Sequence, residues 1–182
     1  EVIKVSEALH EKKVSQIADD FCANPDNSII LIAGPSSSGK TTFAQRLSIQ
    51  LKVNGKNPIA ISLDDYFVNR EDTPLNPDGS YDFEALEAVD LELLNMDLLR
   101  LIEGRSVGLP KFNFITGKRE KSGKIITVDE DSPIIIEGIH GLNPKLTYEI
   151  PEKHKYKIYI SALTQLNLDS HNRISTTDTR LI

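Results

Sequence analysis

The chain contains a single cysteine, Cys22, among its 182 residues, and several features that mark particular classes of protein are missing. One cysteine cannot form an internal disulfide, so nothing in the sequence indicates an oxidising compartment. No apolar run approaches the roughly 18 residues needed to cross a bilayer, and no secretory signal is present. The formal net charge is −6, which gives no electrostatic reason to bind nucleic acid or anionic membranes. We therefore expect a cytoplasmic protein that binds neither nucleic acid nor membranes. The sequence is also compatible with a homo-oligomer.

What the sequence does contain is a glycine-bracketed loop between an apolar stretch and a helix-forming stretch. Residues 29–33 are apolar, and residues 34–41 match the pattern G-x-x-x-x-G-K-[ST]. A serine-rich turn could match by accident, but a strand before the loop and a helix after it favour a phosphate-binding loop. Backbone freedom at Gly34 and Gly39 would let successive N–H groups point at phosphate oxygens. The helix that begins at Lys40 would add the positive end of its dipole.

The same loop predicts how a nucleoside triphosphate binds. Lys40 is expected to reach the outer phosphates, and the hydroxyl group of Thr41 is expected to ligate Mg²⁺. The sequence thus predicts that a nucleoside triphosphate and Mg²⁺ bind here. The nucleotide would be held by the loop residues Gly34, Pro35, Ser36, Ser37, Ser38, Gly39, Lys40, Thr41 and Thr42.

Strand-like and helix-like segments alternate along the chain. Periodicity and turn signals predict helices at 5–22, 40–54 and 83–103, and strands at 28–33, 57–63, 107–114, 124–128, 133–137 and 155–161. This order predicts an α/β fold, namely a P-loop NTPase with three α/β/α layers, a mainly parallel central sheet and a small β-hairpin insertion that binds the acceptor. We expect residues 1–24 to be an N-terminal helix or linker from an upstream region, and residues 25–182 to be a P-loop kinase-like domain.

The ends of the chain suggest that it is part of a longer protein. The sequence starts without a methionine, and residues 175–178 look like a capping box that opens a helix, of which little more than a turn follows. We therefore expect both ends to be cuts in a longer protein.

Acidic residues follow two of the predicted strands. Asp64 and Asp65 come directly after the predicted strand at 57–63. Glu137 is the last residue of the predicted apolar strand at 133–137. Because ligands collect at the carboxyl ends of parallel strands, these carboxylates are expected at the edge that carries residues 34–41. Asp64 is the candidate for accepting the proton of an incoming hydroxyl and for contacting Mg²⁺, and Glu137 is a second candidate metal ligand. The alternatives are an exposed acidic turn and a solvent-facing strand end.

Aromatic residues and one aspartate lie on the presumed acceptor side. Asp82 can accept hydrogen bonds from sugar hydroxyls, and Phe112 and Phe114 can stack on a flat base. Phenylalanines at alternate strand positions are equally typical of a core, so the sequence leaves both interpretations open. Tyr66, just beyond the second strand, is a further candidate acceptor contact. The four histidines show no metal-ligand spacing, and His140 is more typical of an ordinary turn.

Six short motifs link these segments. They are Gly34–Thr41, Ser62-Leu63-Asp64-Asp65-Tyr66-Phe67, Tyr81-Asp82, Leu109-Pro110-Lys111-Phe112-Asn113-Phe114, Ile136-Glu137-Gly138-Ile139 and Asp178-Thr179-Arg180-Leu181. In this order the motifs resemble those of uridine kinases, in the phosphoribulokinase/uridine kinase family of P-loop kinases, over about residues 28–182. The leading segment also resembles a longer bacterial subgroup that carries an extra N-terminal region.

The resemblance implies ATP-dependent phosphorylation of the 5′-hydroxyl of a small-molecule nucleoside, uridine or cytidine. It implies that Asp64 is the catalytic base, that Asp82 binds the ribose, and that Phe112 stacks on the base. It also places three residues at the family's phosphate and metal positions: Lys40, Thr41 and Glu137.

Two departures from the family leave the acceptor open. Uridine kinases commonly carry a histidine on the hairpin that reads the pyrimidine, and the matching position here is Gly117. The lid arginines that clamp phosphates would follow Ile182. A P-loop kinase of another small alcohol, of the pantothenate or sugar-phosphate type, is therefore an alternative. A nucleotide-binding regulatory module is another, although the sequence has neither a D-x-x-G switch segment nor an N-K-x-D guanine reader.

Overall fold

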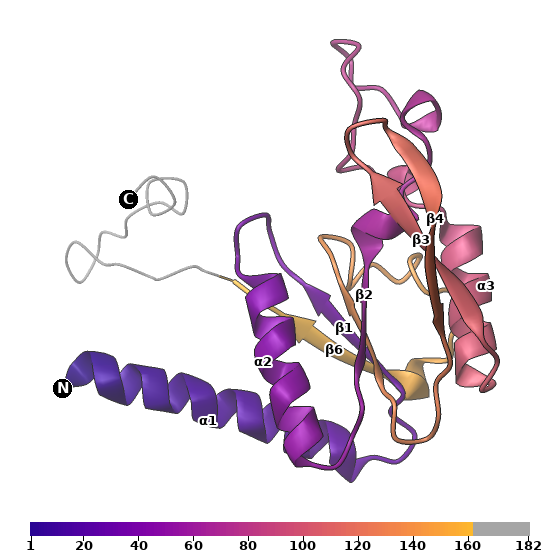
Figure 1. The fold of residues 1–182 in the computed structure, drawn as a ribbon. Helices are drawn as coiled ribbons and strands as arrows, with labels where there is room; N and C mark the ends of the chain where they lie inside the picture. The colour runs from indigo at the N-terminus through magenta and orange to yellow at the C-terminus, as the bar shows by residue number, and fades with distance from the viewer. Residues whose placement is uncertain (162–182) are drawn as a thin grey trace.

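The computed structural model describes residues 1–161, which form an α/β domain around a four-stranded sheet (Figure 1). The strand order is β2-β5-β1-β6, and every neighbouring pair is parallel. The strands are β1 (Ile29–Ala33), β2 (Ile59–Ser62), β5 (Ile134–Glu137) and β6 (Lys155–Tyr159). The predicted capping box at 175–178 and the motif at 178–181 lie outside the described residues.

Helices cover both faces of this sheet, which confirms the three layers. Their bounds are α1 (Val2–Ala23), α2 (Lys40–Val53) and α3 (Leu91–Ile102). Side chains of β1 alternate between two cores: Ile29 and Leu31 pack in the cluster that includes α3, whereas Ile30 and Ile32 pack with α1 and α2. All five residues of β1 are buried, as expected for a strand covered on both faces.

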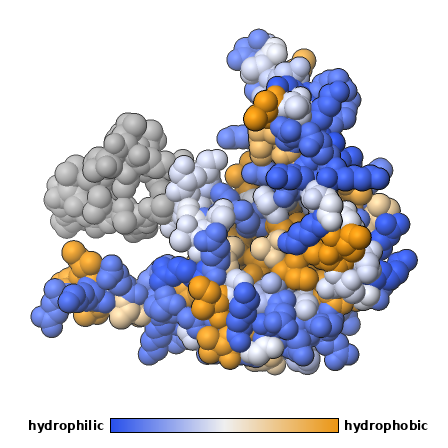
Figure 2. All heavy atoms as spheres, viewed as in Figure 1, coloured by the Kyte–Doolittle hydropathy of each residue, from blue (hydrophilic) through white to orange (hydrophobic). Residues whose placement is uncertain are grey.

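Only the second half of α1 belongs to this core. Val14, Ala18 and Phe21 are buried against the sheet and α2. Nearby, the Glu11 carboxylate accepts hydrogen bonds from Arg46 and from Gln50 on α2. The first half of the helix extends away from the domain, and hydrophobic side chains gather at its free end (Figures 1 and 2). These exposed residues are Val2, Ile3, Val5 and Leu9. No helix within residues 1–161 combines the length and the apolar character needed to span a membrane.

The predicted helix at 83–103 begins too early. The helix starts at Leu91, because the Asp90 carboxylate caps it by accepting a hydrogen bond from the backbone N–H of Leu93 at 3.0 Å. Upstream of this cap, residues 86–88 form a 3₁₀ turn, and Val89 makes an isolated bridge to Phe67. The capped helix ends as predicted, just before Gly104.

The predicted hairpin is present as a separate two-stranded sheet of β3 (Val107–Asn113) and β4 (Lys118–Ile126). The second strand of the hairpin begins earlier than the predicted strand at 124–128. Residues 118–123, which were predicted to be a polar connection, already belong to β4. Most of this strand is exposed to solvent, so its polar and charged side chains carry no burial cost. The hairpin lies beside α3 and reaches beyond the end of β2 (Figure 1).

Candidate active site

The loop between β1 and α2 holds two residues in the left-handed region of backbone conformation, Ser37 at φ 60° and Gly39 at φ 85°. Gly34 does not need a positive φ, so the prediction that it supplies unusual backbone angles is wrong. It is required because the chain passes too closely: a Cβ there would lie 2.2 Å from the Ile160 carbonyl oxygen and 2.8 Å from Ser38 Oγ. The loop therefore folds tightly back against the end of β6.

Most backbone N–H groups of this loop have no partner in the part of the chain that the structure describes. Between Ser36 and Thr42, only the N–H of Ser38 donates to another backbone group, the Pro35 carbonyl at 3.2 Å. The Ser38 hydroxyl oxygen is buried and also lacks a hydrogen-bond partner within residues 1–161. Buried polar groups without partners are costly, and unpaired N–H groups at a helix start attract anions. The loop is thus arranged to receive phosphate oxygens.

Two side chains at the start of α2 connect the loop to its surroundings. The Lys40 ammonium group donates to the Pro35 carbonyl oxygen at 2.9 Å and stays over the loop. The Thr41 hydroxyl donates to Glu137 Oε1 at 3.0 Å. Glu137 is the last residue of β5 and pairs in register with Ile32 of β1, so the parallel sheet itself brings it to the loop. The structure therefore joins two segments that are 96 positions apart in the sequence.

Asp64 lies in a 3₁₀ turn, Leu63–Tyr66, directly after β2. Loss of solvation raises the pKa of the Asp64 carboxyl group, the Glu137 and Asp65 carboxylates raise it further, and the Lys40 ammonium opposes them. Ser62, the last residue of β2, pairs in register with Glu137 of β5, so the turn that carries Asp64 begins beside Glu137. The convergence at the carboxyl edge that the sequence predicts is therefore present in the structure.

The side on which the sequence predicts the acceptor carries a cluster of aromatic rings. Phe67 lies 5.6 Å from Phe112, 6.4 Å from Phe114 and 6.0 Å from Phe83 between ring centroids. Phe114 packs edge-on against Phe112 at 5.1 Å and is itself 58% exposed. Tyr81 extends the cluster through Phe83, at 6.1 Å. Of the two predicted stacking phenylalanines, Phe114 therefore offers an accessible ring.

Two predicted acceptor contacts are core residues. Phe112 is only 3% exposed, so its ring supports Phe114 and cannot stack on a base. Tyr66 is completely buried, and its hydroxyl donates to Asp97 Oδ2 at 3.2 Å, with Asp97 also buried. The expectation that these side chains touch the acceptor is wrong, because Tyr66 packs in the core between the sheet and α3, and Phe112 packs against Phe67 and Phe114.

Asp82 lies in the segment that leads into the aromatic cluster. Its backbone N–H donates to the Pro74 carbonyl at 2.7 Å, and its Oδ1 accepts from the backbone N–H of Glu84 at 2.9 Å. These bonds fix the carboxylate in a turn and leave Oδ2 without a hydrogen bond inside the described range. The geometry is compatible with the predicted ribose contact.

The sequence reasoning missed one residue of this region, Arg70, and assigned another, His140, to an ordinary turn. Arg70 donates from Nη2 to the Phe114 carbonyl oxygen at 2.7 Å and so ties the loop after β2 to the hairpin. His140, three positions after Glu137, has a buried Nε2 atom without a hydrogen-bond partner in residues 1–161. The contact of Arg70 joins two loops that are distant in the sequence, so no local sequence pattern indicates it. The closeness of His140 to Glu137, in contrast, can be read from the sequence.

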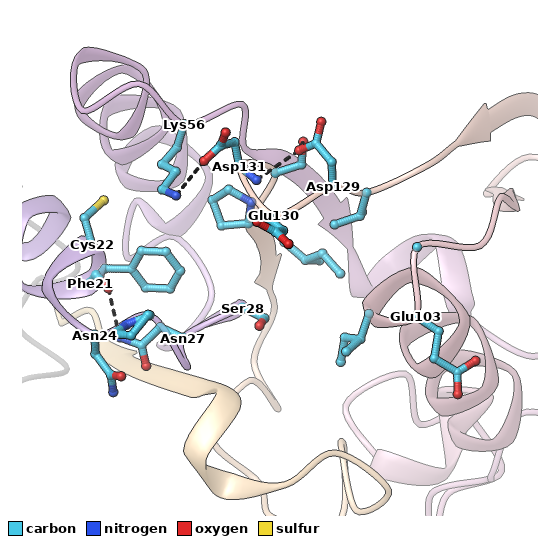
Figure 3. Close-up of a pocket in the computed structure, with 17 residues that line it drawn as sticks. Phe21, Cys22, Asn24, Asn27, Ser28, Lys56, Glu103, Asp129, Glu130 and Asp131 are labelled. Atoms are coloured by element: carbon cyan, nitrogen blue, oxygen red, sulfur yellow. Dashed lines mark hydrogen bonds and ion pairs between the residues drawn. The ribbon is translucent and has the colours of Figure 1, made fainter.

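A cavity lies at the opposite, amino-terminal edge of the sheet (Figure 3). It has a volume of about 630 Å³, and residues before β1 and at the start of β5 line it. Its charged side chains are Glu103, Asp129, Glu130, Asp131 and Lys56, and the Lys56 ammonium pairs with Asp131 at 2.8 Å. The excess of carboxylates would repel a triphosphate, so this cavity is not a candidate nucleotide site.

The donors beside the loop suit a metal ion that is shared with bound phosphates. Within residues 1–161, no group of three or more histidine, cysteine or acidic side chains could hold a metal by itself. Mg²⁺ is usually held by one or two carboxylates together with substrate phosphates and waters, so a complete protein cage is not needed. The oxygen atoms of Thr41 and Glu137, 3.0 Å apart beside the phosphate loop, are ligands of the type that Mg²⁺ takes.

Comparison with known families and proteins adds to this geometry. A profile described as the phosphoribulokinase/uridine kinase family matches residues 29–176. The uridine kinase of Schizosaccharomyces pombe is 37% identical over 113 residues, which cover 61% of this chain and 24% of that protein. The uridine kinase of Saccharomyces cerevisiae is 31% identical over 141 residues, which cover 74% of this chain and 26% of that protein. The chain thus spans about a quarter of the length of these two curated relatives.

Solved structures agree on the fold. The structure of a possible uridine kinase from Bacillus stearothermophilus superposes with a TM-score of 0.57 at 26% identity, covering 73% of this chain and 70% of that one. A protein described as a fructose transport system kinase, from Silicibacter sp. TM1040, gives a TM-score of 0.59 at 16% identity, over 79% of this chain and 73% of that one. The second likeness concerns the fold alone.

Proposed function

Because the chain belongs to the phosphoribulokinase/uridine kinase family, we propose that the protein is an ATP-dependent phosphotransferase that phosphorylates the 5′-hydroxyl of a nucleoside, uridine or cytidine. The observation that carries the proposal is the meeting of the phosphate loop, Glu137 and Asp64 at one edge of the sheet. The names of the relatives support the acceptor class, since those from both yeasts are uridine kinases. The exposed ring of Phe114 supports a flat acceptor.

The phosphate end of the site is built for ATP. The unpaired N–H groups of the loop would bind the β- and γ-phosphates, and Lys40, held over the loop, would neutralise the outer phosphate. Thr41 and Glu137 would hold Mg²⁺, which when bound spreads the negative charge of the phosphates. The Thr41 hydroxyl has lone pairs that could coordinate the ion while its proton is donated to Glu137.

The acceptor end is built around Asp64. Its carboxylate would orient the 5′-hydroxyl and accept its proton while the oxygen attacks the γ-phosphorus in line and the bond to ADP breaks. The raised pKa of Asp64 makes it a better proton acceptor than an ordinary aspartate, provided that the group is ionised. Asp82 would hold the ribose hydroxyls, and Phe114 would cover one face of the base.

The remaining expectations complete the proposal. The acceptor is a small molecule, and neither nucleic acid nor a membrane is a partner. The protein is cytoplasmic, and the sequence is compatible with a homo-oligomer. Helix α1, which precedes the family match at residue 29, is an N-terminal addition whose second half packs on the kinase domain.

A screen of ADP release tests the proposal. Purified protein is incubated with Mg²⁺ and ATP, alone and with uridine, cytidine, purine nucleosides, pantothenate or sugar phosphates. Release of ADP that requires uridine or cytidine, with the 5′-monophosphate as the product, supports the proposed function. Release that requires another small alcohol would assign a different kinase, and release independent of any acceptor would indicate an ATPase or a nucleotide switch.

A further inference from the structure

The turn of the β3–β4 hairpin leaves no room for a side chain at Gly117. This residue has φ 68°, and a Cβ there would lie 2.7 Å from Arg70 Nε and 2.8 Å from Arg70 Cζ. The side chain of Arg70 therefore lies across the turn, in the space that a side chain at position 117 would enter. A loop residue from the other side of the acceptor region thus occupies the tip of the hairpin.

Hydrogen bonds from both its backbone and its guanidinium group hold Arg70 in this place. Its backbone N–H donates to the Gly117 carbonyl oxygen at 2.8 Å, and its Nη2 donates to the Phe114 carbonyl oxygen at 2.7 Å. Next to it, Asn69 Oδ1 accepts from the backbone N–H of Arg119 at 3.1 Å. A guanidinium group held in this way is already ordered before a ligand arrives, so little side-chain entropy is lost when it binds.

The charge of Arg70 is not neutralised by the described part of the chain. Arg119 pairs with Asp90 at 2.7 Å and Arg46 pairs with Glu11, whereas no carboxylate lies within ion-pair distance of Arg70 in residues 1–161. A guanidinium group has five N–H donors, and the bond to Phe114 is the one hydrogen bond that its side chain makes within that range. Arg70 therefore has donors to spare while it is bound to the backbone of Phe114, a residue that is itself largely exposed.

An aromatic face next to unused N–H donors suits a flat ring that carries carbonyl oxygens. We propose that Arg70 reads the edge of the acceptor base and selects a pyrimidine with an oxygen at position 4 over one with an amino group there. The inference rests on the proposed nucleoside kinase function and deepens it.

The selectivity follows from the chemistry of the arginine side chain. A guanidinium group only donates hydrogen bonds, so it can pair with the O4 atom of uracil. The 4-amino group of cytosine is itself a donor, and two opposed donors leave an N–H group without a partner. The protein therefore prefers uridine to cytidine, and this preference resides in Arg70.

Steady-state kinetics with uridine and cytidine test this assignment in the wild-type protein and in Arg70→Gln. A glutamine amide both donates and accepts, so it pairs with either base. A hydrogen bond to a charged group is worth about 1.5–3 kcal/mol, so the kcat/KM ratio of uridine to cytidine should fall about tenfold or more, chiefly through the KM for uridine. The kcat for cytidine should change little, since Arg70 does not touch the reacting atoms.

Two further variants separate recognition from structural support. Arg105→Met removes an exposed arginine that pairs with Glu103 and should leave the ratio unchanged. Arg70→Lys keeps the charge and the donor-only character, so it should retain the preference for uridine at a lower kcat/KM. It also serves as the test variant if Arg70→Gln does not fold, because loss of the uridine preference in a folded Arg70→Lys protein would contradict donor-based selection.

The results that overturn the inference differ from those that overturn the proposed function. If the wild-type protein phosphorylates nucleosides but does not prefer uridine, or if Arg70→Gln lowers kcat/KM equally for both, Arg70 does not read the base. If the wild-type protein phosphorylates neither nucleoside, the nucleoside kinase function itself fails, and the role of Arg70 fails with it.

Discussion

Replacement of Gly34 by alanine tests the tight fold of the phosphate loop. The added Cβ would lie 2.2 Å from the Ile160 carbonyl oxygen, well inside the distance at which these atoms repel. Ile160 cannot move away freely, because its own N–H donates to the Ala33 carbonyl at 2.7 Å and continues the pairing of β1 with β6. The loop would have to move instead, and its N–H groups would lose their common direction.

The expected size of this effect follows from the contact. Forcing one methyl group into a tightly packed place costs about 1–3 kcal/mol of unfolding free energy. For a domain of this size, that cost corresponds to a fall in Tm of about 2–12 °C. We also expect the Kd for ATP to rise at least tenfold, because the anion site itself is displaced.

Thermal unfolding and calorimetric titration with ATP measure the two effects, with two alanine variants for comparison. Gly108→Ala is the matched control, since nothing lies within 4 Å of its added Cβ and its φ is not positive; its Tm and Kd should stay near those of the wild type. Gly39→Ala also meets open space but has φ 85°, so backbone strain alone should cost about 1–2 kcal/mol. A Gly34→Ala protein with wild-type Tm and wild-type Kd for ATP would refute the reasoning.

Three other predictions concern the acceptor side. Tyr66→Phe removes the partner of the buried Asp97 carboxyl group, so we expect a loss of about 1–3 kcal/mol in chemical denaturation with an unchanged acceptor KM; a raised KM with unchanged stability would restore the acceptor role to Tyr66. Gly117→Ala combines a positive φ with a contact to Arg70, and should lower the unfolding free energy by about 1–2 kcal/mol; a stabilised variant would show that the turn differs. Asp64 must be ionised to accept a proton and its pKa is raised, so kcat/KM should fall as the pH drops, with a midpoint above the ordinary value of about 3.9; a rate that stays flat down to that value would contradict this.

Much of the fold could be predicted from the sequence, because the signals are local or periodic. The apolar strand before Gly34 and the helix after Lys40 identify the phosphate loop, and alternating elements predict a parallel sheet. The parallel sheet then predicts that Glu137 and Asp64 meet the loop, since carboxyl ends of parallel strands share an edge. The hydrogen bond between Thr41 and Glu137 is the outcome of that rule.

The errors arise where tertiary contacts override local patterns. The side chain of Asp90 starts α3 well after the apolar pattern begins, and solvent allows β4 to begin with charged residues. The burial of Tyr66 and Phe112 depends on the position of α3 and the hairpin, which no local pattern records. The place of Arg70 over Gly117 joins two loops and likewise required coordinates.

The central claim is that Asp64 orients an acceptor hydroxyl toward ATP held by the loop at Lys40. The most direct test is the rate of uridine-dependent ADP release by Asp64→Asn, measured together with its Kd for ATP. Asparagine cannot accept the proton, so the account predicts a kcat lower by about two to four orders of magnitude and a Kd for ATP within a few-fold of the wild type. Turnover close to that of the wild-type enzyme would contradict it.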